Sequence, residues 1–249
     1  PHRRRRTPAQ AAPHWHGRHP PLPPPAPRHD RTHVLSESSV GILGGTGPQG
    51  RGLGRRLAAA GYSVVLGSRS ADRAASVAVG IGSDQITGGD NQQAAEAALV
   101  IVPVPYAGHA KLLESLREPL SGKIVIDCVN PLGFDKQGPY PLDVPDGSAA
   151  QEAQRILPDS TVIAAFHHLS AARLEDPAVQ DFDEDVLVLG EDRAAIGVVI
   201  ALAIAALPGS RGVYAGRLRN AGQVEAFTAN LIAINRRYKT HAGLRITEL

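Results

Sequence analysis

Three glycines with the spacing of a phosphate-binding turn are the first residues of this chain that point to chemistry. Gly45, Gly47 and Gly50 follow the apolar stretch VGIL at residues 40–43 and open a stretch of helical pattern. In such a turn the first glycine permits a tight bend, the second lets a pyrophosphate approach the backbone, and the third lets helix and strand pack closely. Pro48 suits the first turn of the helix, whose free amides face the anion. The turn predicts a dinucleotide site, although glycines so spaced also occur in ordinary turns.

Two arginines stand where NAD-binding chains carry an acidic residue. That carboxylate is expected about 20 residues beyond the glycines, where it accepts hydrogen bonds from the ribose hydroxyls. This chain instead has Ser68 and Arg69 there, followed by Arg73. A carboxylate would repel a 2′-phosphate, whereas guanidinium groups would pair with it, and Ser68 and Thr46 add hydroxyl donors. The sequence therefore predicts NADP(H), unless both arginines merely lie at a solvated helix end.

Short apolar runs alternate with helical stretches from Val40 onward. Continuous apolar runs are typical of strands buried on both faces, and alternation with helices predicts a parallel sheet. The fold class is therefore α/β, a Rossmann-type doubly wound, mostly parallel sheet with a small C-terminal helical portion. The helix expected at 194–207 is apolar nearly all round, which predicts deep packing. The expected strands cover residues 40–43, 63–67, 99–105, 123–129, 161–166 and 185–190, and the expected helices run to about Ala60 and over 71–79, 194–207 and 221–238.

The composition divides the chain into a basic tail and a body. Residues 1–36 hold seven arginines against one acid and nine of the 20 prolines, so we expect a disordered tail. We expect residues 37–165 to form the NADP-binding domain and residues 166–249 a C-terminal portion that completes the sheet. The body is net negative, which argues against nucleic acid or an anionic membrane as the principal partner.

The single cysteine and the hydropathy of the chain limit the cellular compartment in which we expect the protein. Cys128 is the only cysteine, so no internal disulfide can form, and a reducing compartment is expected. The longest apolar run is shorter than the ~20 residues that span a bilayer, which favours a cytoplasmic protein. His14, His16 and His19 of the tail could hold a metal ion loosely, but we expect no metal site. A homodimer is compatible with the apolar helix but not required by it.

The ends of the predicted strands supply further candidate residues. Pro105–Tyr106, Asn130–Pro131 and Phe166–His168 each follow a predicted parallel strand, where the ligands of open sheets bind. His167 is the one candidate for a chemical role, through a hydrogen bond to a ring that gains charge. It is equally compatible with a histidine that satisfies backbone groups at a strand end.

Several segments together resemble a known enzyme family. GILGGTGPQGRGLGRRLAAAGYSVVLGSRSADRA, ITGGDNQQAAEAA, VPVPYAGHA, VIDCVNPL and FHHLSAARL are similar to segments of the NADPH-dependent reductases of coenzyme F420, an 8-hydroxy-5-deazaflavin. The similarity runs from about Val40 to the C-terminus. The resemblance implies hydride exchange between C4 of nicotinamide and C5 of the deazaflavin, with the two rings stacked in a cleft beside the C-terminal portion.

The resemblance also assigns roles to individual residues. On the deazaflavin side it implies His167 and the backbone around Leu169. Tyr106 stands where some members have tryptophan, and residues 168–170 differ from the Thr-Ile-Pro of archaeal members, which leaves the fine shape of the ring pocket open. The NADP contacts that it implies are Thr46, Gly47, Pro48, Gln49, Ser68, Arg69, Arg73, Tyr106, Ala110 and Ala171.

Two other functions fit parts of the same pattern. A reductase of a small carbonyl or imine substrate on a similar fold usually places a lysine as proton donor over the substrate. Lys111, Lys123, Lys136 and Lys239 are the only lysines, and none has a clear position at the cleft. A non-catalytic protein that senses the NADPH/NADP ratio would need the dinucleotide site alone.

Overall fold

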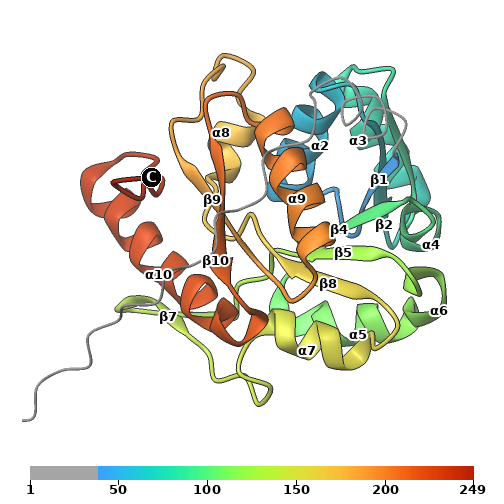
Figure 1. The fold of residues 1–249 in the computed structure, drawn as a ribbon. Helices are drawn as coiled ribbons and strands as arrows, with labels where there is room; N and C mark the ends of the chain where they lie inside the picture. The colour runs from blue at the N-terminus through green and yellow to red at the C-terminus, as the bar shows by residue number, and fades with distance from the viewer. Residues whose placement is uncertain (1–38) are drawn as a thin grey trace, which may run out of the picture.

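The computed structural model describes residues 39–249, and the predicted tail at 1–36 lies outside them. One sheet of eight strands forms the centre of the molecule, in the order β10-β9-β8-β5-β4-β1-β2-β3 (Figure 1). Its strands are β1 (Ser39–Ile42), β2 (Ser63–Ser68), β3 (Ile86–Asp90), β4 (Leu99–Val102), β5 (Ile124–Asp127), β8 (Thr161–Ala164), β9 (Asp185–Leu189) and β10 (Arg211–Gly216).

The order β3-β2-β1-β4-β5-β8 is that of a Rossmann sheet, and these six strands are parallel. β9 is antiparallel to β8 and meets it at the single pair Ala164–Leu189, while β10 is parallel to β9. The predicted α/β class with a mostly parallel sheet is therefore confirmed. β9 and β10 continue the same sheet, so the domain boundary expected after residue 165 stays a prediction.

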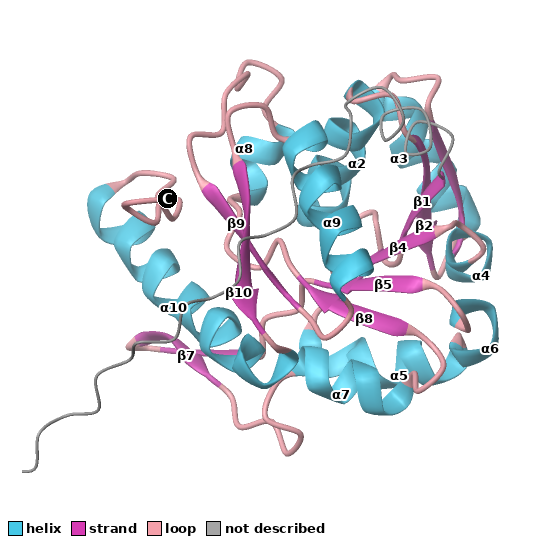
Figure 2. Cartoon of the chain, in the orientation of Figure 1, coloured by secondary structure: helices cyan, strands magenta, loops and turns pink. Residues whose placement is uncertain are grey.

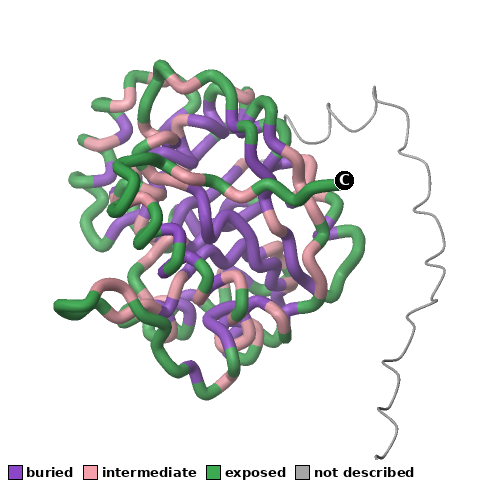
Figure 3. Tube along the Cα trace, turned by 90° about the vertical axis from the view of Figure 1, so that its left-hand side faces the viewer, coloured by how far each residue is buried: buried purple, intermediate pink, exposed green. Residues whose placement is uncertain are grey.

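Helices cover both faces of the sheet because each buried strand presents apolar side chains to both sides (Figure 2). In β4, Leu99 and Ile101 enter one core cluster, and Val100 and Val102 enter the other. The first cluster packs beneath α2 (Pro48–Ala59), α3 (Ala71–Ile81), α8 (Ala171–Glu175) and α9 (Arg193–Ala206). The second packs beneath α4 (Asn91–Ala95), α5 (Tyr106–Ser115), α6 (Arg117–Leu120) and α7 (Ala149–Ile156). Figure 3 shows the buried residues gathered through the middle of the molecule.

Two elements outside the layers shape the site. A hairpin of β6 (Leu132–Asp135) and β7 (Gly138–Pro141) follows β5, and the long helix α10 (Ala221–Tyr238) packs against β7 and α7 (Figure 1). A short 3-10 turn at Leu218–Asn220 leads into α10. No helix within residues 39–249 is long and apolar enough to cross a membrane.

Some expected elements differ from the structure. The strand expected at 99–105 ends at Val102, because Pro103 and Pro105 have no N–H to donate to the ladder. The prediction that the helix at 194–207 is deeply packed is wrong. One face of α9 is buried, whereas Ile204 on the other face is 49% exposed. β3, β10 and the hairpin were not expected, since each contains glycine or proline and only a short apolar run.

Candidate functional site

The glycine turn joins β1 to α2 at the carboxyl edge of the sheet. A Cβ atom on Gly50 would lie 2.6 Å from the Cα of Gly45, so only glycine permits this close packing of turn and helix. A Cβ on Gly47 would meet nothing nearer than the Gly44 carbonyl oxygen at 3.9 Å, so this side of the backbone is open. Gly47 is the N-cap of α2 and supplies no side-chain hydrogen bond to the first turn. The free amides of that turn form an anion-binding position.

Two residues that fix this turn were missed from the sequence. Gly44 has a φ of +61°, a conformation that favours glycine, and its N–H donates to Oδ1 of Asn91 at 2.9 Å. Asn91 follows Asp90, which forms a capping box with Gln93 at the start of α4. The D-x-x-Q spacing could have indicated a helix start at this edge of the sheet.

A first cavity of about 480 Å³, the phosphate cavity, opens beside the ends of β1 and β2. Arg69 and Arg73 are exposed and form no ion pair with any described residue. Ser70, also missed, caps α3 by accepting the N–H of Arg73 at 3.3 Å. Among residues 39–249 no carboxylate lines the cavity, so it is a basic site suited to a phosphate. Its lining is Gly44, Thr46, Gly47, Ser68, Arg69, Ser70, Arg73, Asn91, Val104, Pro105, Gly108 and Leu112.

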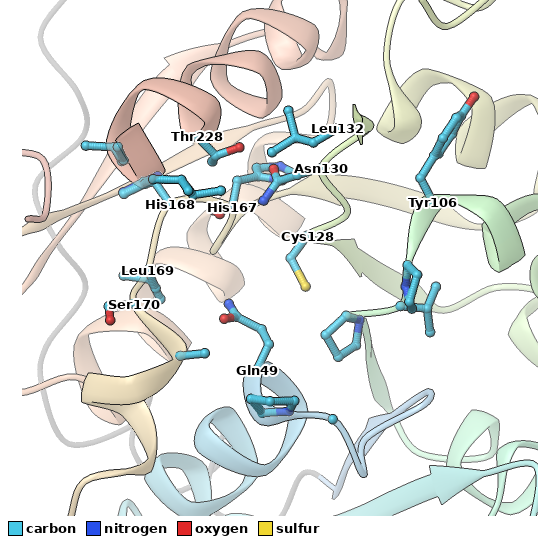
Figure 4. Close-up of a pocket in the computed structure, with 18 of the residues that line it drawn as sticks. Gln49, Tyr106, Cys128, Asn130, Leu132, His167, His168, Leu169, Ser170 and Thr228 are labelled. Carbon is cyan, nitrogen blue, oxygen red and sulfur yellow. Dashed lines mark hydrogen bonds between the residues drawn. The ribbon is translucent and has the colours of Figure 1, made fainter. Parts of the chain in front are cut away.

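A second cavity of about 750 Å³, the ring cavity (Figure 4), adjoins the first, because Gly44, Gly47, Val104 and Pro105 line both. Its walls come from the glycine turn, the segments after β4, β5 and β8, the hairpin and α10. Most of its surface is apolar. Other residues that line it include Pro48, Gln49, Tyr106, Cys128, Asn130, Leu132, His167, His168, Leu169, Ser170, Ala171, Thr228, Leu231, Ile232 and Asn235.

The segment after β8 is held in a strained turn. Phe166 is buried and has a φ of +64°, which costs a non-glycine residue on the order of 1–2 kcal/mol. Nε2 of Gln49 donates to the Phe166 carbonyl at 3.1 Å, and Nδ2 of Asn130 donates to the His167 carbonyl at 2.9 Å. Side chains from two other strand ends thus hold the turn in place.

His167 and Asn130 carry buried polar atoms that form no well-aligned hydrogen bond with a described residue. These atoms are both ring nitrogens of His167, which lie near the backbone of Cys128 and Val129, and Oδ1 of Asn130. The two side chains lie side by side at the ring cavity (Figure 4). Burial lowers the pKa of His167 to about 4, so the ring is neutral at pH 7, with one donor and one acceptor nitrogen. Because both residues line the ring cavity, their polar side chains are candidates to hydrogen-bond a polar ring that fills it. His168 donates through Nε2 to the Asp185 carbonyl at 2.6 Å, while its Nδ1 is also buried without a partner among the described residues.

A buried charged cluster lies behind the ring cavity. The fully buried ring of His109 places Nε2 at 2.6 Å from Oδ2 of Asp127 and Nδ1 at 3.1 Å from Oε2 of Glu152. Glu225 of α10 accepts the N–H groups of Ala149 and Ala150 at the start of α7. The cluster ties α5, β5, α7 and α10 together, although sequence alone indicated no role for these residues.

Four predicted site residues line neither cavity. Gly45 and Gly50 lie behind the turn, as their packing requires. Ala110 packs against the second core cluster, and the Pro131 carbonyl accepts the N–H of Leu142 at the base of the hairpin. The other predicted residues line one cavity or both.

The strand order and the glycine-rich turn after β1 define a Rossmann-type, dinucleotide-binding class of fold. The family model described as "NADP oxidoreductase coenzyme F420-dependent" matches residues 39–131. The F420-dependent NADP reductase of Methanothermobacter marburgensis is 37% identical over 222 residues, which are 84% of this chain and 98% of that protein. That of Methanocaldococcus jannaschii is 39% identical over 224 residues, again 84% of this chain and 98% of the relative.

The chain belongs to the family of F420-dependent NADP reductases. A solved structure described as a putative F420-dependent NADP reductase from an Arthrobacter species superposes with a TM-score of 0.74 at 24% identity. The superposition covers 85% of this chain and all of the other, and it shows that the fold is shared.

Proposed function

We propose that this protein transfers a hydride between NADP(H) and the deazaflavin coenzyme F420. The observation that carries the proposal is the pair of adjoining cavities, one lined by guanidinium groups and the other apolar with buried polar atoms of His167 and Asn130. The family's relatives carry the same activity in their names. The two carriers supply the redox chemistry, so the protein has to align them and exclude water.

On the NADP side, the amides at the start of α2 would bind the pyrophosphate. Arg69 and Arg73, with Ser68 and Thr46, would bind the 2′-phosphate in the phosphate cavity. The nicotinamide would then lie along the shared wall, between Pro105 and Ala171. We assign the preference for NADP over NAD to the two arginines.

On the deazaflavin side, the ring would lie against Leu169 and the segment that Gln49 and Asn130 hold. Reduction by NADPH adds a hydride at C5 and takes up a proton from solution. Neutral His167 would donate a hydrogen bond to a ring atom that gains negative charge. This is a stabilising role, because a ring with a pKa of about 4 carries no spare proton at neutral pH.

The alternative functions lack comparable support. No lysine within residues 39–249 lines the ring cavity, so the proton donor of a carbonyl or imine reductase has no counterpart there. A sensor would need only the phosphate cavity, and the buried polar groups of the ring cavity would serve no purpose. The homodimer and the cytoplasmic location stay predictions.

The test follows the absorbance of oxidised coenzyme F420 mixed with the protein and NADPH. We expect bleaching with NADPH and much slower bleaching with NADH. Gly47→Val would place a side chain where the pyrophosphate approaches, without a backbone clash, because Gly47 has a φ of −76°. The matched control is Gly197→Ala on α9, where a Cβ meets nothing within 4 Å.

Loss of bleaching in Gly47→Val, with full activity in Gly197→Ala, supports the proposal. Bound NADPH without bleaching in the unaltered protein would instead favour the sensor. NADPH oxidation by a cyclic imine, with none by the deazaflavin, would favour the imine reductase.

A further inference from the structure

One helix that lines the ring cavity ends in a strongly basic segment. Thr228, Leu231, Ile232 and Asn235 of α10 line the cavity. These positions fall on one face of the helix, because residues three and four apart are neighbours. Helical spacing places Arg236 one turn beyond Ile232 and Lys239 one turn beyond Asn235.

The charges of this segment are not balanced locally. Residues 236–247 contain Arg236, Arg237, Lys239, His241 and Arg245 but no acidic residue. Arg245 pairs with Asp183 at 3.0 Å, whereas Arg236, Arg237 and Lys239 form no ion pair within residues 39–249 and are exposed. Of these three cations only Lys239 lines a cavity. Unpaired exposed cations at one end of a helix attract an anionic ligand.

A third cavity, of about 550 Å³, adjoins the ring cavity at this point. Arg173, Lys239, Thr240 and His241 line it together with Ala172, Asp176 and Val179. Oγ of Ser170, which lines the ring cavity, lies 3.2 Å from Nδ1 of His241. The two cavities therefore share a wall. A ligand that leaves the ring cavity there meets Lys239 and His241, together with Asp176 and with Arg173, which pairs with Glu184.

The backbone of Lys239 adds an independent observation. Lys239 ends α10 in the left-handed conformation, with φ 52° and ψ 50°, at a position where glycine is usual. A lysine there costs conformational free energy that glycine would avoid.

We propose that Lys239 and Arg236, with His241, bind the anionic side chain of the deazaflavin coenzyme. This inference rests on the proposed function. Beyond its ring and ribityl chain, coenzyme F420 carries a phosphodiester and glutamate carboxylates, which are ionised at neutral pH. With the ring in the ring cavity, the basic end of α10 directs this chain into the third cavity.

The test compares coenzyme F420 with the deazaflavin riboside that ends at the ribityl hydroxyl. For each of Lys239→Gln and Arg236→Gln, we expect the KM for F420 to rise roughly two- to fivefold, as for one exposed ion pair. The KM for the riboside and the Kd for NADPH should stay unchanged. Added salt should raise the KM for F420 but not that for the riboside.

Arg237→Gln is the matched control. It removes the same charge from the same helix end, but Arg237 lies one turn beyond Ala233, which does not line the ring cavity. Equal effects of all three variants, or equal effects on F420 and the riboside, would overturn the inference. Absence of NADPH-dependent turnover with both deazaflavins would instead count against the proposed function.

Discussion

The buried histidine behind the ring cavity makes the stability of this protein depend on pH. Both ring nitrogens of His109 face carboxylate oxygens, at 2.6 Å in Asp127 and 3.1 Å in Glu152, so both must carry hydrogen. Burial opposes protonation, but the combined attraction of the two carboxylates outweighs it and raises the pKa of His109 from 6.5 to about 9. A raised pKa stabilises the fold fully below the unfolded value and progressively less as the pH rises through 9.

The magnitude follows from that shift. A rise from 6.5 to about 9 corresponds to about 3 kcal/mol of folding free energy. Between pH 7.5 and 9 the protein should lose about 1.5 kcal/mol of it. Urea unfolding of the unaltered protein and of His109→Gln at both pH values measures the loss, because the variant has no titrating group at this position. We expect His109→Gln to be less stable at pH 7.5 and to lack this part of the pH dependence.

Glu225 provides the control for this experiment. Burial is the main cause that raises its pKa from 4.5 to about 7, and Asp127 adds to the shift. The stability that Glu225 contributes is therefore lost as the pH rises through 7, and most of this loss is complete before pH 7.5, where the measured interval begins. Glu225→Gln should keep the slope between pH 7.5 and 9. A slope in His109→Gln equal to that of the unaltered protein would show that the histidine is not protonated in the folded state.

Three further predictions concern single side chains. Arg69→Ala should raise the calorimetric Kd for NADPH about tenfold and leave the Kd for NADH nearly unchanged, with Arg117→Ala as the control. Equal losses of affinity for NADPH and NADH would exclude recognition of the 2′-phosphate by Arg69. Arg56 is buried and donates to four backbone carbonyls within residues 173–179. Arg56→Met should therefore lower the free energy of unfolding by about 3 kcal/mol. A decrease of less than about 1 kcal/mol would contradict this interpretation of the four hydrogen bonds. His167→Gln should lower kcat/KM for the deazaflavin about tenfold while the Kd for NADPH is kept, and an unchanged kcat/KM would refute the stabilising role.

The central strands could be predicted because continuous apolar runs in the sequence indicate strands buried on both faces. β4, β5 and β8 are short apolar runs rich in valine and isoleucine, and the glycine turn follows β1 with its full spacing. β3 could not be predicted in this way, since Gly88 and Gly89 make up two of its five residues and only its partner β2 defines it. The exposed side of α9 could not be predicted either, because an isoleucine such as Ile204 is expected in the core from its residue type alone, whereas here it is exposed.

The candidate site could be proposed from the sequence only where one local motif indicates it. The glycine turn and the arginines after β2 lie within 30 residues of each other, and their proposed roles follow from that spacing. The hydrogen bonds that shape the ring cavity join Gln49 to Phe166 and Asn130 to His167, across 117 and 37 residues. The ion pairs of His109 reach residues 18 and 43 positions away. Such contacts depend on which strand ends become neighbours, and no single stretch of sequence encodes that.

The bonds that hold the Phe166 turn explain how one fold can align two carriers. Gln49 belongs to the turn that we propose to bind the pyrophosphate, and its side chain also donates to the Phe166 carbonyl beside His167. A hydrogen bond therefore joins the glycine turn, which lines both cavities through Gly44 and Gly47, to the turn after β8 that shapes the ring cavity. A hydride passes only between atoms held in close, aligned contact, so the separation of the rings is the quantity that the protein must control. The strain at Phe166 is opposed by bonds from two separate strand ends, which is the arrangement expected of a turn that must not move.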